Sequence, residues 1–184
     1  MSLWQDYLQP ETVEEALTAL VSAPGPSAII AGGTDLLLDI QQGRHPPVHT
    51  LVDVSRVEEM RRVRSDDAHL YLGAAVTHQE IIQHPLLQVQ AQCLVDACGL
   101  IGGPQIRNVA TLGGNVAHAL PAGDGTIALL ALDAEAQLTS TDGSRWDPVE
   151  KLFAGPGETA FDRKREILIG FRLPILGPRE ASAF

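Results

Sequence analysis

Strand and helix signals alternate along this chain of 184 residues without a regular period. Brief apolar runs at 28–31 and 50–54 are typical of buried strands, whereas residues 13–21 carry apolar side chains at helical spacing. A doubly wound sheet would instead repeat strand and helix in turn. The irregular order therefore predicts an α+β fold.

Hairpin signals supply most of the expected sheet. Residues 61–75 and 135–146 each carry strand-like residues on both sides of a polar turn, and the second turn is an Asp-Gly pair. Residues 167–173 are expected to form a last strand, which Pro174 ends.

Capping sequences mark two helix starts. Thr12 and Thr77 are each followed three residues later by a glutamate, which is the pattern of a capping box. The helix that follows Thr77 is expected to break at Pro85 and then to continue to a C-cap at Gly99.

Composition excludes several classes of protein. The chain has no run of about 18 apolar residues, so no transmembrane helix is expected, and its first residues do not have the pattern of a signal peptide. Cys93 and Cys98 are too few for a disulfide scaffold, which favours a cytoplasmic location. The formal net charge of −10 argues against nucleic acid and anionic membranes as partners.

Residues 101–125 lose all periodicity and include six glycines. No strong helix is expected before Thr126, where a short buried helix should begin. An irregular stretch of this length inside a compact domain is usually functional.

Two glycine pairs share a pattern. Gly32 and Gly33 follow an apolar run, Gly113 and Gly114 follow Thr111-Leu112, and a short polar residue comes after each pair. Consecutive N–H groups in such a turn can converge on anionic oxygens without any charged side chain. Neither 28–38 nor 109–126 contains Lys or Arg, so backbone dipoles and hydroxyls would have to hold a diphosphate. Either pair alone is equally compatible with a tight turn or close packing.

Other short motifs carry less weight. The chain has no P-loop sequence, and the segment 155–160 matches a dinucleotide fingerprint only formally, because it follows no expected strand and is therefore interpreted as a surface turn. His45 and His49 are separated by two prolines, which exclude the helix that would align them on a metal ion. No metal site and no catalytic acid, base or nucleophile is predicted.

Four segments together resemble a known family. The sequences at 31–36, 104–108, 111–115 and 121–124 are similar to those of the FAD-binding medium subunit of the molybdenum hydroxylases, the xanthine dehydrogenase and carbon monoxide dehydrogenase type. That subunit has the flavin-binding fold of vanillyl-alcohol oxidase and p-cresol methylhydroxylase. The resemblance covers essentially the whole chain.

The resemblance implies a set of residues that bind FAD non-covalently. One turn would contact the diphosphate from one side through Ile30, Ala31, Gly32, Gly33, Thr34, Asp35 and Leu36. The other turn would contact it through Thr111, Gly113, Gly114 and Asn115. Ile101 and Gly102 would lie near the isoalloxazine, Asp124 would accept hydrogen bonds from sugar hydroxyls, and Leu168 would contact the adenine or flavin region.

Several of these side chains have alternative interpretations. Asp124 could instead cap the helix expected at Thr126, and for Asp35 we favour a capping role. Gln105 and Arg107 could either contact the cofactor or support the second turn. His118 lies beside the second turn, but a loop histidine without a special role is the simpler interpretation.

The resemblance also implies an electron-transfer subunit rather than a free-standing enzyme. A cluster needs about four cysteines, and this chain has two, so iron–sulfur clusters are expected in one partner subunit and the molybdenum cofactor in another. NAD or another acceptor would take the electrons, and the substrate cannot be inferred. The alternatives are an assembly module that has lost FAD, or a stand-alone flavin oxidoreductase of the same fold.

The expected domain organisation follows from the same resemblance. Residues 1–55 would form a small FAD-binding lobe and 56–176 a larger one, while 177–184 would be the truncated start of the family's C-terminal domain. Without that domain, we expect the chain alone to retain FAD weakly.

Overall fold

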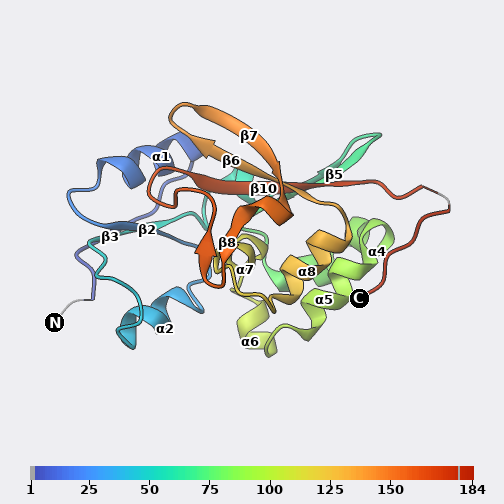
Figure 1. Ribbon diagram of the computed structural model, residues 1–184, viewed down its shortest axis with the longest axis horizontal. Helices are drawn as coiled ribbons and strands as arrows, with labels where there is room; N and C mark the ends of the chain where they lie inside the picture. Colours follow the sequence, from blue (N-terminus) through green and yellow to red (C-terminus); the bar gives the residue numbers. More distant parts are fainter. Residues whose placement is uncertain (1–2, 178) are drawn as a thin grey trace.

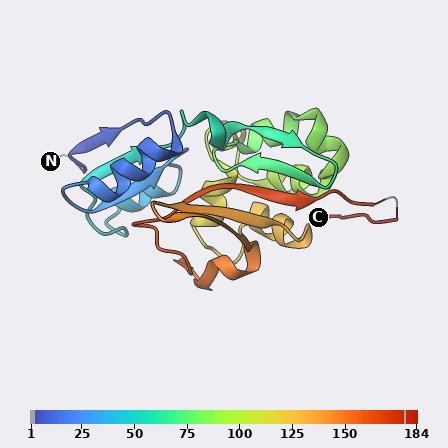
Figure 2. The same ribbon diagram turned by 90° about the horizontal axis from the view of Figure 1, so that it is seen from above.

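The computed structural model describes residues 3–177 and 179–184. A small lobe built on a three-stranded sheet lies beside a larger lobe built on a five-stranded sheet (Figures 1 and 2), which confirms the α+β fold. The boundary proposed at residue 55 falls in the connection between the sheets. Residues 1, 2 and 178, which the proposed domain ranges include, lie outside the described residues.

The small lobe is a parallel sheet in the order β1, β3, β2. Its elements are β1 (Asp6–Leu8), α1 (Val13–Ser22), β2 (Ser27–Ile30), α2 (Leu36–Gln41) and β3 (Thr50–Asp53). As expected, the Thr12 hydroxyl caps α1 by accepting from the Glu15 N–H at 3.1 Å. The Glu15 carboxylate accepts from the Glu11 N–H rather than from the N–H of Thr12, so the box at this helix is incomplete.

The large lobe is an antiparallel sheet in the order β4, β5, β10, β6, β7. Its strands are β4 (Val63–Ser65), β5 (His69–Gly73), β6 (Glu135–Ser140), β7 (Gly143–Pro148) and β10 (Ile167–Pro174). Both expected hairpins and the expected last strand are therefore present. A small hairpin of β8 (Phe153–Gly155) and β9 (Glu158–Thr159) turns at Gly157, within the segment interpreted as a surface turn.

Helices cover one face of this sheet (Figure 1). They are α3 (His78–Gln83), α4 (Pro85–Gln90), α5 (Gln92–Leu100), α6 (Pro104–Arg107), α7 (Leu112–Ala117) and α8 (Asp124–Ala131), with the 3-10 turns η1 (Glu58–Arg61) and η2 (Val149–Leu152) elsewhere. The capping box at Thr77 is complete.

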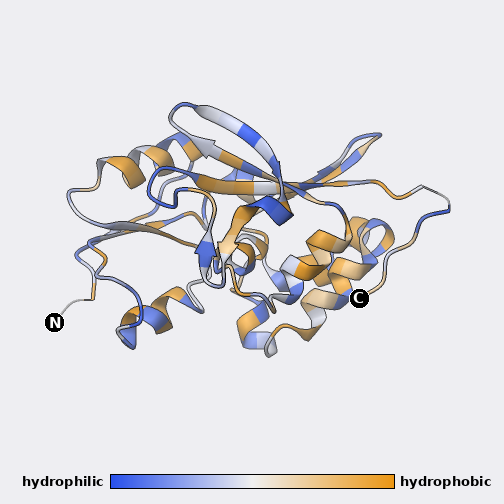
Figure 3. Cartoon of the chain, viewed as in Figure 1, coloured by the Kyte–Doolittle hydropathy of each residue, from blue (hydrophilic) through white to orange (hydrophobic). Residues whose placement is uncertain are grey.

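The core lies between this sheet and its helices. Fully buried side chains from the sheet and the helices form one cluster, among them Leu70, Leu72, Leu94, Leu112, Leu129, Leu138 and Phe171. Figure 3 shows hydrophobic residues concentrated along α5 and α8. Leucine, alanine, valine and isoleucine supply most of this core, as expected of a chain with 4% aromatic residues.

Three local predictions are wrong. Residues 101–125 contain the helices α6 and α7, and α8 begins at Asp124 rather than at Thr126. The helix that follows Pro85 is interrupted at Ala91, whose φ of −143° is not helical. Finally, α5 continues through Gly99 and ends at Leu100, so the residue with positive φ after it is Gly102.

Asp53 links the strands of the small lobe at the C-terminal end of β3. Only 4% exposed, its carboxylate accepts hydrogen bonds from the Tyr7 hydroxyl (2.8 Å), Gln9 Nε2 (2.9 Å) and the Ser55 N–H (2.9 Å). Burial acts to raise the pKa of Asp53, but these hydrogen bonds outweigh it and hold the pKa below its ordinary value. Burial and the bond to Asp53 raise the pKa of Tyr7 to about 12.

Replacing Asp53 with Asn is expected to lower the free energy of unfolding at pH 7 by about 1–3 kcal/mol, because three donors lose a charged acceptor at a buried position. The Asp53 carboxylate contributes fully to the free energy of unfolding above the pKa of about 4 that it has in the unfolded chain. This contribution is lost as the pH falls through the lower pKa of the folded chain. The difference in stability between wild type and Asp53→Asn should therefore shrink in acid. Urea unfolding at pH 7 and at about pH 3 measures it, with Asp67→Asn, an exposed turn residue, as the control. Equal stability of Asp53→Asn and wild type at pH 7 would contradict the role of this network.

Candidate functional site

The two glycine turns meet where the lobes adjoin. The first turn, 31–35, connects β2 to α2, and the backbone just before α7 lies against it. A Cβ atom on Gly32 would lie 2.0 Å from the carbonyl oxygen of Val109 and 2.9 Å from the Cα atom of Ala110. Only a residue without a side chain permits this approach. The fold thus brings together the two turns that the sequence singled out.

The first turn presents a run of free backbone donors. The N–H groups of residues 32–36 have no acceptor within the described part of the chain. Gly33 has a φ of +68° and Asp35 is right-handed, and combining left- and right-handed residues in a turn can direct successive N–H groups to one side. The turn also follows the C-terminal end of a parallel strand, where open parallel sheets bind ligands. This turn has the geometry expected of an anion-binding site.

The second turn differs from the prediction. Residues 112–117 are helical with Thr111 as the N-cap, and the first amides of α7 have acceptors inside the chain. The N–H of Leu112 donates to the Val76 carbonyl (3.0 Å), that of Gly113 to the Ala74 carbonyl (2.8 Å), and that of Gly114 to the Thr111 hydroxyl (3.1 Å). The prediction of a second nest of free amides is therefore wrong, because pairing with residues 74–76 uses them.

Each residue of the second turn has a distinct packing environment. A Cβ atom on Gly113 would lie 2.6 Å from the Cβ atom of Ala74, so this glycine is required for packing. Gly114 is exposed. The Asn115 Oδ1 atom accepts from the N–H (3.0 Å) and the hydroxyl (3.2 Å) of Thr126, which fixes the start of α8 against α7.

Arg107 organises the turn that follows α5. Its Nη1 group donates to the carbonyls of Gly99 (3.3 Å), Ile101 (3.2 Å) and Gly102 (2.7 Å), and Gly102 has a φ of +48°. The buried Nε atom of Arg107 has no partner among the described residues. Of the two roles left open for Arg107, the structure shows support of a turn, but of 99–102 and not of the second glycine turn.

A buried neutral pair lies behind the second turn. The Nδ1 atom of His78 is 3.4 Å from the Sγ atom of Cys98, and the His78 N–H donates to the Ala110 carbonyl at 3.0 Å. Burial, helped by the positive charge of Arg107, lowers the pKa of His78 to about 4, although the negative charge of Asp35 acts to raise this pKa. Burial raises the pKa of the Cys98 thiol to about 12, so both groups are neutral at pH 7.

The remaining site candidates lie in different environments. Asp35 occupies the N-cap position of α2, but its side chain makes no capping bond and instead accepts from the Thr34 hydroxyl at 3.2 Å, so the preference for a cap is wrong. Asp124 is the first residue of α8, whose N-cap is Gly123. Asp124 acts on the buried Cys98 electrostatically, as Asp35 does on His78. Leu168 is 7% exposed and belongs to the main core.

Sequence reasoning left Arg107 undecided and named no role for His78. Arg107 is the one basic residue between Arg64 and Arg145, a signal that could have drawn attention to it. No pattern in the sequence shows that His78 is buried against Cys98, because the contact joins two helices.

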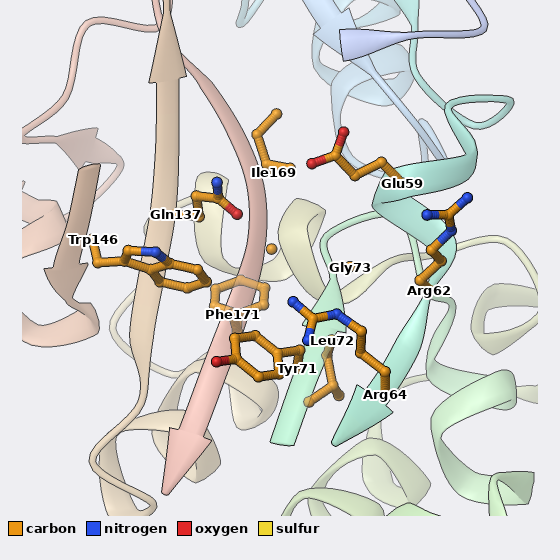
Figure 4. A pocket seen from close by; sticks show the side chains of 11 residues that line it. Glu59, Arg62, Arg64, Tyr71, Leu72, Gly73, Gln137, Trp146, Ile169 and Phe171 are labelled. Carbon is orange, nitrogen blue, oxygen red and sulfur yellow. The ribbon is translucent and has the colours of Figure 1, made fainter. Parts of the chain in front are cut away.

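A separate hollow of about 210 Å³ lies on the large sheet, between η1 and β7 (Figure 4). The Arg64 guanidinium lies over the Tyr71 ring at 3.8 Å, and that of Arg172 over the Trp146 ring at 4.6 Å. The chain's own arginines therefore cover these rings, and none of the predicted cofactor residues lines the hollow.

Among the described residues there is neither a cluster of metal ligands nor a helix suited to cross a membrane. Within residues 3–177 and 179–184 no group of three or more His, Cys, Asp or Glu side chains is arranged to hold a metal ion. Among the same residues, none of the helices has the length and apolar character needed to cross a membrane.

A family model and several known proteins match this chain. Residues 3–176 match the model described as the FAD binding domain in molybdopterin dehydrogenase. The nicotinate dehydrogenase FAD-subunit of Eubacterium barkeri is 35% identical over 83% of this chain and 51% of its own length. The carbon monoxide dehydrogenase medium chain of Hydrogenophaga pseudoflava is 30% identical over 92% of this chain and 58% of its own length.

Solved structures agree with these sequence matches. A carbon monoxide dehydrogenase structure from Hydrogenophaga pseudoflava superimposes with a TM-score of 0.89 at 29% identity, over 95% of this chain and 60% of that one. Quinoline 2-oxidoreductase from Pseudomonas putida superimposes with a TM-score of 0.87 at 27% identity, over 94% of this chain and 59% of that one. The chain therefore spans between half and three fifths of the length of these relatives.

The close approach of the two turns predicts opposite results for two glycine substitutions. Gly32→Ala is expected to destabilise the chain by at least about 1–3 kcal/mol, because its methyl group would overlap a backbone carbonyl. Gly114→Ala adds its methyl group near only a hydroxyl, at 3.1 Å on an exposed helical residue, and is expected to be neutral or slightly stabilising. Thermal unfolding of both variants measures this. Equal destabilisation of the two would show that the turns do not touch as described.

The buried imidazole predicts a dependence of stability on pH. In the unfolded chain His78 binds a proton below a pKa of about 6.5, whereas in the folded chain it does so only below about 4. Burying the neutral imidazole costs no proton above about pH 6.5, so its contribution to the free energy of unfolding is complete there. As the pH falls from about 6.5 to about 4, the unfolded chain takes up a proton that the folded chain does not, and the free energy of unfolding falls by up to about 3 kcal/mol. Denaturant unfolding at pH 7 and pH 4.5 should show a smaller loss for His78→Asn than for wild type. An NMR titration of His78 with a pKa near 6.5 would contradict this.

Proposed function

This chain belongs to the family of FAD-binding domains found in molybdopterin dehydrogenases, and from that premise we propose that it binds FAD non-covalently where the first glycine turn meets the residues before α7. The observation that carries the proposal is the run of free N–H groups at residues 32–36. A diphosphate supplies anionic oxygens for such donors. Thr34 and Thr111 add hydroxyl groups at the two turns.

Residues near the first turn offer complementary groups for the rest of the FAD molecule. Exposed apolar side chains at Leu100 and Ile106 lie beside the turn 101–102, and we propose that the isoalloxazine lies there. Val109, also exposed, lies near the first glycine turn. Asp124 would face sugar hydroxyls, since a carboxylate facing the diphosphate would repel it. The buried and unpartnered Nε atom of Arg107 marks a polar group of this region that an acceptor outside the chain could satisfy.

We propose that the chain works as the FAD-binding electron-transfer part of a multi-subunit molybdenum hydroxylase. When bound, FAD supplies redox chemistry that the side chains of the protein lack. Both cysteines are free and buried, and burial raises the pKa of each thiol. Because a cluster needs about four cysteine ligands, we propose that iron–sulfur clusters lie in one partner subunit. We propose that the molybdenum cofactor lies in another and that NAD or another acceptor receives the electrons.

FAD binding by the purified chain tests this proposal. We expect FAD to bind at least tenfold more tightly than riboflavin, because riboflavin lacks the diphosphate that the free amides would hold. Gly33→Val is expected to weaken FAD binding at least tenfold while changing riboflavin binding little, since a β-branched residue resists the φ of +68° on which the turn depends. Calorimetric titration with both ligands measures the affinities.

Gly157→Val is the matched control, because Gly157 also has a positive φ, of +78°, but lies in the β8–β9 turn. It is expected to leave FAD affinity unchanged. Absence of FAD binding by the folded chain, or equal affinity for FAD and riboflavin, would overturn the assignment.

A further inference from the structure

Exposed apolar side chains occur both next to the free amides and next to the turn after α5. Val109, whose carbonyl lies against Gly32, is 47% exposed, Ile106 is 41% exposed and Leu100 is 68% exposed. A Cβ atom on Gly102 would lie 3.1 Å from the Cβ atom of Ile106, so the turn lies against the Ile106 side chain. A planar ring attached to a diphosphate at residues 32–36 would find its apolar contacts here.

The turn itself has a definite polarity. Its carbonyls at Ile101 and Gly102 are directed to the Arg107 guanidinium. In a trans peptide the N–H points opposite to the C=O, and the described chain has no cis peptide bond. The same two peptide units contain the N–H groups of Gly102 and Gly103. These N–H groups are therefore directed away from Arg107. Neither has an acceptor within the described residues.

The charge behind this turn is not neutralised by a partner. No ion pair joins Arg107 to a carboxylate among the described residues, and Arg107 is the one basic residue between Arg64 and Arg145. A cation bonded to the carbonyl side of a peptide unit polarises it and strengthens its N–H as a donor.

We propose that Arg107 is a positioning residue that sets the reduction potential of the bound flavin. It holds the 99–102 turn so that the Gly102 and Gly103 N–H groups face the polar edge of the ring, and its charge favours the reduced, more negatively charged FAD over the oxidised form. This inference rests on the proposed binding of FAD and extends it to a residue that acts through the turn.

Neutral and charged replacements separate the two effects of Arg107. Arg107→Gln keeps a donor but loses the charge, so we expect reduced FAD to lose at least tenfold more affinity than oxidised FAD, which equals a shift of the midpoint potential by about −30 mV for a two-electron couple. Arg107→Lys keeps the charge but replaces the rigid guanidinium, whose Nη1 group donates to the carbonyls of Gly99, Ile101 and Gly102, with a flexible ammonium group. It should retain the wild-type potential while releasing FAD several-fold faster.

The measurements are a spectroelectrochemical titration of bound FAD and its dissociation rate, with thermal unfolding of each apo variant to verify folding. Arg64→Met, which removes a positive charge from the hollow on the large sheet, should change neither quantity. An unchanged potential in Arg107→Gln, or equal shifts in the Gln and Lys variants, would overturn this inference alone. A wild-type chain that binds no FAD would overturn the proposed function and the inference with it.

Discussion

The contact between Gly32 and the Val109 carbonyl is the constraint on which the proposed FAD site depends. Because no side chain separates the two backbones, the small lobe lies directly against the residues that precede α7. This contact fixes the first turn while leaving its N–H groups unpaired. Fully buried unpaired donors would each cost about 1–3 kcal/mol. Residues 31–34 are only half-buried, so water can satisfy these donors until a ligand displaces it.

The elements predicted correctly are those whose signals are local. The hairpins, the capping box at Thr77 and the break at Pro85 follow from side chains within a few residues of one another. The helix α7 was missed because Gly113 and Gly114 are poor helix formers. Hydrogen bonds from its first amides to residues 74–76 offset that weakness, and these partners are distant in sequence. The end of α5 was misplaced for a similar reason, since Arg107 binds the carbonyls beyond Gly99.

In the candidate site, too, the features that depend on local sequence could be predicted and those that depend on distant contacts could not. The free amides of the first turn could be anticipated because a glycine pair after a strand is a local pattern. The sequence could not show that the second pair uses its amides for packing, since Gly113 and Gly32 are both glycines that allow close approach. Only the fold distinguishes a glycine that exposes its N–H from one that buries it. The roles of Arg107 and His78 likewise depend on contacts between helices.

The placement of charge explains how an acidic chain can hold an anionic ligand. With a net charge of −10, diffuse attraction would not bring a dinucleotide to this surface, so binding must rest on short-range donors. The neutral amides of residues 32–36 would supply these donors to the diphosphate. The guanidinium of Arg107 lies behind the 99–102 turn, which is proposed to face the isoalloxazine ring. Affinity and reduction potential are then governed by different residues. A substitution in the first turn should change how firmly the cofactor is held, whereas a substitution at Arg107 should change which oxidation state is favoured.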